Sequence, residues 1–175
     1  MENKVTIWKN AVIYGLIGGI LMIAFSLILW LLGMMESKGL GMLTYLILAF
    51  AMFLGAKNWR DRFNEGWMTY GEAFKTGFFV VLISSVLLII YNYIFFNFID
   101  PEFIENQMAT AEEKILEANP NISDADFDKA MAIAKRFSST TMLAVMGFIA
   151  NVIFGTIIAS LVAIFAKNEN KSVAV

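Results

Sequence analysis

The chain has 175 residues, of which 59% are hydrophobic and 16% charged, and its net charge is −2. Soluble domains are about 45–50% apolar and about 25% charged, so we expect lipid rather than water to cover part of this surface. Because the chain has neither His nor Cys, disulfides, Cys/His zinc sites, thiolate nucleophiles and imidazole bases are excluded. The slightly negative charge also argues against nucleic-acid binding, which needs a clustered basic surface.

Four long charge-free runs predict four membrane-spanning helices. We place the spans at about 10–35, 39–56, 72–99 and 139–166. A helix needs about 20 mostly apolar residues to cross a bilayer core of about 30 Å, and only the second run is shorter. The runs also lack the alternation of polar and apolar residues that barrel strands show. The predicted fold is an all-α bundle of four transmembrane helices, forming a single membrane domain over residues 1–175.

The distribution of Lys and Arg predicts the orientation of these spans. If both termini are cytoplasmic, the inside segments contain eight basic residues and the outside segments contain five. Cytoplasmic loops normally carry this excess. The segment 100–138, outside in this scheme, has nine acidic and four basic residues and therefore a net charge of −5. We expect both termini in the cytoplasm, although Lys135 and Arg136 beside the fourth span argue the other way.

The connector between the second and third spans, residues 57–71, combines aromatic and basic side chains. Successive aromatic residues are separated by 4, 4, 3 and 4 positions, which is the spacing of one helical face; they are Trp59, Phe63, Trp67, Tyr70 and, just beyond the connector, Phe74. Such a segment is typical of the headgroup layer, as an ordinary anchor or as a site for an anionic ligand or lipid headgroup. Thr69 and Glu72 form a capping-box pattern that predicts a helix start near Tyr70. The candidate headgroup or anion contacts are Trp59, Arg60, Arg62, Tyr70 and Lys75.

Three motifs suggest a family. They are G-x-x-x-W-R-D at 55–61, G-W-M-T-Y-G-E-A-F-K-T-G at 66–77, and N-F-I-D-P-E-F at 97–103. With its small size and four spans, the chain resembles the bacterial membrane family known as domain of unknown function 4199 over nearly its whole length. The resemblance implies an integral protein of the bacterial inner membrane and implies no activity.

Residues 100–138 are predicted to form two amphipathic helices joined by a turn at Asn119–Asn121, making an extracytoplasmic helical hairpin. Asp100-Pro101-Glu102 is a helix-start pattern, and Ser123 with Asp126 is a second one. The two helices either pack on each other, lie on the membrane surface or form a docking site for a protein partner. The expected apolar faces are Ile104, Met108, Ala111 and Ile115 on the first helix, and Phe127, Ala130, Met131, Ala134 and Phe137 on the second.

Small residues and one Asn recur every four positions along the first and fourth spans. The candidate helix-packing seam contains Gly15, Gly19, Gly147, Asn151, Gly155 and Ala159. This seam serves either to pack the bundle or to form a homo-oligomer or ligand contact.

No residue pattern indicates a catalytic site, a cofactor-binding site or a metal site. The triplet Asp124, Asp126 and Asp128 lacks the Gly and Glu of a calcium loop. We therefore expect a non-catalytic membrane protein that interacts with lipid or with a protein partner. The alternative is a small oligomeric transporter or channel subunit, although the charge-free runs, the third of which begins at Thr76, contain no Asp, Glu, Lys or Arg.

Overall fold

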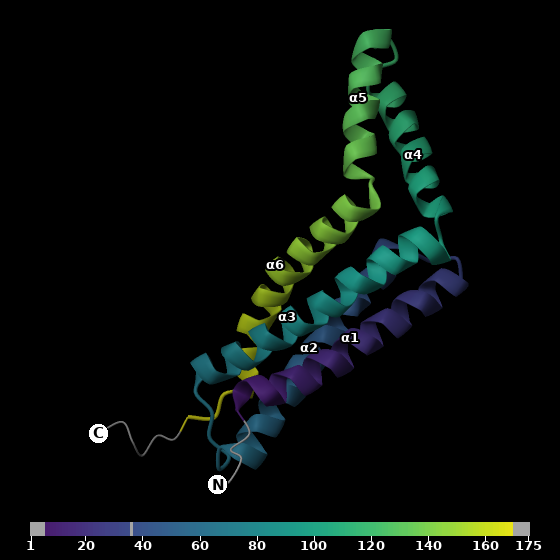
Figure 1. Cartoon of the computed structure of the whole chain (residues 1–175). Helices are drawn as coiled ribbons and strands as arrows, with labels where there is room; N and C mark the ends of the chain where they lie inside the picture. Colours follow the sequence, from purple (N-terminus) through teal and green to yellow (C-terminus); the bar gives the residue numbers. More distant parts are fainter. Residues whose placement is uncertain (1–5, 36, 170–175) are drawn as a thin grey trace. The chain divides into compact units, whose positions relative to one another are not determined.

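The computed structural model describes residues 6–35 and 37–169, which are helical for most of their length (Figure 1). Within these residues there is no β-strand, and Met68 and Asn168 form an isolated β-bridge. Four helices are long and apolar enough to cross a membrane, which confirms the predicted all-helical class with four candidate spans. The elements are α1 (Ile7–Leu31), α2 (Lys38–Phe63), α3 (Tyr70–Ile94), the π-helical η1 (Phe95–Ile99), α4 (Glu102–Ala118), α5 (Asp124–Phe137) and α6 (Thr140–Ala166).

The chain divides into two compact units. The first contains the described residues up to Leu88 and those from Ile149 onward, and the second contains Ile89–Phe148. In the first unit, α1, α2 and the parts of α3 and α6 that belong to it lie side by side (Figure 1). The N-terminus of α1 and the C-terminus of α6 lie at the same end of this unit, as do the end of α2 and the start of α3.

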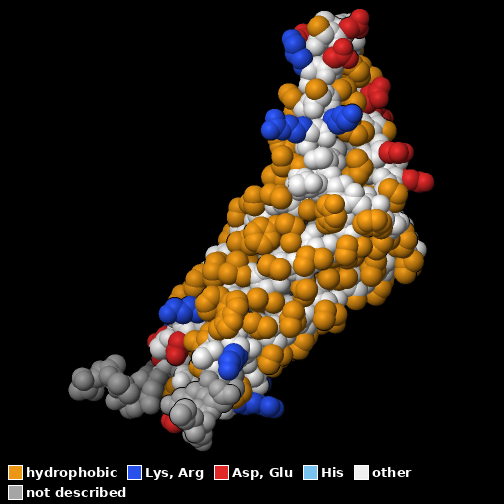
Figure 2. Space-filling view, in the orientation of Figure 1, with side chains coloured by type: hydrophobic (Ala, Val, Ile, Leu, Met, Phe, Trp, Pro, Cys, Tyr) orange, Lys and Arg blue, Asp and Glu red, His pale blue; other side chains and the backbone are white. Residues whose placement is uncertain are grey.

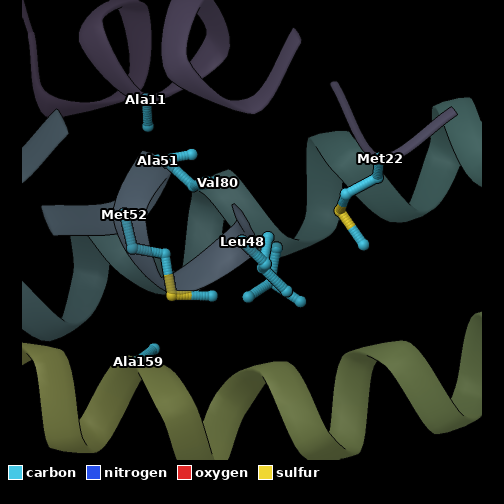
Figure 3. Close-up of a cluster of buried hydrophobic side chains, with 8 residues drawn as sticks. Ala11, Met22, Leu48, Ala51, Met52, Val80 and Ala159 are labelled. Atoms are coloured by element: carbon cyan, nitrogen blue, oxygen red, sulfur yellow. The ribbon is translucent and has the colours of Figure 1, made fainter. Parts of the chain in front are cut away.

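The core of the first unit is built from small and flexible apolar side chains contributed by all four helices (Figure 3). Small residues allow helix backbones to approach closely, which is how helices associate in lipid. The outer surface is also apolar, with large exposed side chains over the face shown in Figure 2. A surface of this kind is stable in hydrocarbon and unstable in water. The buried core residues are Ala11, Met22, Leu48, Ala51, Met52, Val80, Val81 and Ala159.

The second unit contains the predicted pair of amphipathic helices, α4 and α5, which contact each other. Ser123 caps α5 as predicted: its Oγ accepts from the Asp126 N–H at 3.3 Å and donates to the Asp126 carboxylate at 2.8 Å. The helix α4 begins at Glu102, one residue later than predicted, although the Asp100 carboxylate still accepts from the Phe103 N–H at 3.1 Å. The predicted apolar faces are half-buried, except that Phe137 is 53% exposed.

Candidate interfacial site

The helix α2 continues through Lys57 to Phe63, beyond the predicted second span. It ends where Glu65 and Gly66 adopt positive φ angles of 53° and 84°. The Gly66 N–H donates to the Arg60 carbonyl at 2.8 Å and so satisfies one of the carbonyls left free at the helix end. The left-handed conformation suits Gly66, whereas it strains the non-glycine residue Glu65.

The turn after α2 is joined to the segment that follows α6. Met68 and Asn168 exchange two backbone hydrogen bonds of 2.9 and 2.8 Å, and Asn168 Nδ2 donates to the Gly66 carbonyl at 2.8 Å. The Met68 side chain is fully buried in a small cluster with Ala56, Ala73, Ala163 and Ala166. These contacts hold the connector against the end of the bundle. The sequence patterns did not predict them, because they join residues about 100 positions apart.

Arg60, a predicted headgroup contact, forms two bonds inside the first unit. Its Nη1 donates to the Ala166 carbonyl at the C-terminus of α6 at 3.0 Å, and its Nε bonds Asp61 Oδ1 at 2.7 Å. A cation at a helix C-terminus is favoured by the partial negative charge of the free carbonyls. Arg60 therefore links α2 to α6. Its guanidinium has further N–H donors that these two bonds do not use.

The start of α3 confirms the predicted capping box. The Thr69 N–H donates to Glu72 Oε2 at 2.8 Å, and the Glu72 N–H donates to Thr69 Oγ1 at 3.3 Å. The helix begins at Tyr70, as the pattern predicts, and the Tyr70 hydroxyl donates to the Ser160 carbonyl at 3.4 Å.

The aromatic residues of the connector do not share one helical face. Trp59 and Phe63 stand on α2, Tyr70 and Phe74 stand on α3, and Trp67 lies in the turn between them. Each helical pair is in contact within its own helix, with ring centroids 5.8 and 6.5 Å apart. Trp59 Nε1 is buried and has no hydrogen-bond partner in the described part of the chain.

Several aromatic and basic side chains are exposed at this end of the first unit. Phe63, Trp67 and Tyr70 are 39–43% exposed. The predicted contacts Arg62 and Lys75 are also exposed, and neither takes part in an ion pair among residues 6–35 and 37–169. Exposed aromatic rings beside unpaired cations are typical of the membrane interface. Lys4 and Lys171, which contribute to the predicted charge asymmetry, lie outside the described residues.

The predicted seam residues of the first unit stand at contacts between helices. A Cβ added at Gly15 or Gly19 would lie 2.6 Å from Ile83 or 2.7 Å from Leu87, both on α3. On α6, Asn151 Nδ2 donates to Ser85 Oγ of α3 at 2.7 Å. Gly155 faces Val81, and Ala159 faces Gly77, so this side of α6 is covered within the chain. Gly147 belongs to the second unit, where an added Cβ would lie 3.4 Å from Asn92 Nδ2.

The structural features identify the general class of the protein, and the comparison with known families identifies its family. Four long apolar helices with an apolar exterior are those of a multi-pass membrane protein. The chain belongs to the family described as protein of unknown function (DUF4199), whose model matches residues 13–168. No curated protein and no solved structure matches the chain significantly.

Proposed function

We propose that this chain is a non-catalytic protein of the bacterial inner membrane that interacts with lipid at one end and with a protein partner at the other. Both termini and the connector would be cytoplasmic, and α4 and α5 would form a helical hairpin outside the membrane. The basic excess at the connector end and the net charge of −5 over residues 100–138 support this orientation.

The bonding of the buried polar groups is the observation that favours this function over transport. Among the described residues, the fully buried set contains no Asp, Glu, Lys or Arg. Ser84 and Ser85 donate to carbonyls one turn earlier on α3, at 2.6 and 2.7 Å, and Asn151 bonds Ser85. Proton-coupled and ion-coupled sites in membranes normally use ionisable side chains. Polar groups that bond one another inside the bundle serve helix packing instead.

The α4–α5 segment supplies the proposed partner surface. Leu116 on α4 is 43% exposed, and Ile133 and Phe137, one turn apart on α5, are 60% and 53% exposed. Acidic residues predominate on α4, whereas α5 carries three acidic and three basic residues. An apolar patch within a charged rim is the usual composition of a protein interface.

Photo-crosslinking in intact cells tests this proposal. A photoreactive residue at Ile133 should give a discrete adduct whose partner is identified by mass spectrometry, and one at the exposed Glu113 should give far less. Adducts of lipid mass alone would show that α5 lies on the membrane, and the partner role would then be wrong.

A further inference from the structure

A groove of about 530 Å³ runs between α1 and α2 in the first unit. Its walls are partly exposed: Ile17 is 46% exposed, Leu46 64% and Phe50 62%. The groove is therefore open along its outer side and is lined by hydrocarbon. The lining residues are Tyr14, Ile17 and Leu21 of α1 and Leu46, Ile47, Phe50, Ala51 and Leu54 of α2.

One turn beyond the groove, α1 and α2 carry polar side chains in place of apolar ones. Asn10 precedes Tyr14 by four residues, and Asn58 follows Leu54 by four, so each continues the groove side of its helix. Asn58 Nδ2 donates to Asn10 Oδ1 at 2.7 Å, and Asn10 Nδ2 donates to the Gly55 carbonyl at 2.8 Å. The apolar groove therefore ends beside the hydrogen-bonded side chains of Asn10 and Asn58.

Two opposite charges stand at this polar end. Lys57 and Asp61 follow Phe50 and Leu54 at helical spacing, which places all four on one side of α2. Lys57 is exposed and belongs to none of the ion pairs between described residues. Asp61 bonds Arg60 through Oδ1, and its side chain is 42% exposed. Lys57 and the second carboxylate oxygen of Asp61, which the Arg60 pair does not use, therefore lie one turn apart on the groove side of α2.

We propose that this groove binds a zwitterionic phospholipid whose headgroup carries an ammonium. One acyl chain lies along the groove, the phosphate pairs with Lys57, and the ammonium pairs with Asp61. The groove and the surrounding lipid or detergent are equally apolar, so the acyl chain only fills the groove and the headgroup contacts set the preference among lipids. A headgroup that is only anionic offers no donor to the second oxygen of the Asp61 carboxylate. The inference rests on the proposed function only in that α1 and α2 must lie in a membrane.

Lipid titration of the full-length protein tests this site. The delipidated protein in detergent is titrated with phosphatidylethanolamine, phosphatidylglycerol and diacylglycerol of identical chains, and bound lipid is counted by native mass spectrometry. Phosphatidylethanolamine should bind most tightly and diacylglycerol least. Lys57→Gln should weaken phosphatidylethanolamine binding about tenfold, because one charge-assisted contact is lost. Lys114→Gln removes the same charge from an exposed position of α4 in the second unit, outside the predicted headgroup contacts, and should leave binding unchanged.

Two further substitutions probe the acidic group and the groove itself. Asp61→Asn should abolish the preference for phosphatidylethanolamine over phosphatidylglycerol. Ile17→Trp should fill the groove from an exposed wall position and reduce binding of all three lipids. Leu16→Trp is the matched control, because Leu16 is 41% exposed on another side of α1 and does not line the groove.

Equal binding of the three lipids, or equal effects of the two lysine substitutions, would overturn the proposed site. So would equal effects of the two tryptophan substitutions. If the protein sediments with membranes and requires detergent but retains no lipid, the groove is wrong and the membrane placement stands. If the protein is soluble without detergent, both proposals fail.

Discussion

Replacing Gly15 with Ala should separate α1 from α3. The added Cβ would lie 2.6 Å from the Ile83 Cβ and 3.1 Å from the Val80 carbonyl oxygen. Neither atom belongs to the flexible end of a side chain, so α3 itself must shift. Gly41→Ala is the matched control, because Gly41 is also helical and an added Cβ there has nothing within 4 Å.

The size of the effect follows from two opposing terms. Alanine is favoured over glycine in a helix by about 0.5–1 kcal/mol, and both variants gain this term. Overpacking of a well-packed contact costs about 1–3 kcal/mol, and only Gly15→Ala incurs it. The two variants should therefore differ by about 1–3 kcal/mol in free energy of unfolding, with Gly41→Ala the more stable.

Thermal unfolding in a single detergent, followed by tryptophan fluorescence, measures this difference. For a chain of this length, 1 kcal/mol shifts the midpoint by about 2–4 °C. Gly15→Ala should therefore melt several degrees below Gly41→Ala. Equal midpoints for the two variants would refute the close approach of α1 and α3.

Three other changes test separate parts of the structure. The hydrogen bond from Ser123 lowers the pKa of Asp126, so its contribution to α5 is present above the ordinary pKa of Asp and is lost as pH falls through the lowered pKa. Helicity measured by circular dichroism should therefore fall below about pH 4, and an unaltered titration of Ser123→Ala would argue against the cap. Asn151→Leu removes the bond to Ser85 and should cost about 1 kcal/mol or less with the fold retained; loss of the folded protein from size-exclusion chromatography would contradict simple packing. Glycine adopts the positive φ angle of position 65 without strain, so Glu65→Gly should increase the free energy of unfolding by up to about 1 kcal/mol and raise the unfolding midpoint. A lowered midpoint would count against the strain.

Local patterns in the sequence were sufficient to predict most helix positions. The apolar runs predicted four long helices, and the Thr69–Glu72 pair predicted the start of α3, because capping involves residues only three apart. The end of α2 was harder to place. Charged residues after position 56 suggest the end of a span, but a helix can continue out of lipid until a residue such as Gly66 stops it.

The long-range contacts of the candidate site could not be predicted from local patterns. The bond from Arg60 to the Ala166 carbonyl and the bridge between Met68 and Asn168 depend on how the helices pack. The same limitation applies to Asn10, whose amide bonds Asn58 across α1 and α2. Its position at the edge of an apolar run was the one local sign that it had a role.

The proposed topology places the chain ends and the α4–α5 segment on opposite sides of the membrane. Cysteine labelling tests this central claim most directly. The chain contains no Cys, so Asn121→Cys and Glu169→Cys each introduce a single thiol. Both positions are exposed, one in the turn between α4 and α5 and the other after α6. A reagent that passes the outer membrane but not the inner membrane should label Asn121→Cys in intact cells, and Glu169→Cys only after lysis. Labelling of Glu169→Cys in intact cells, with Asn121→Cys protected, would contradict the proposed topology.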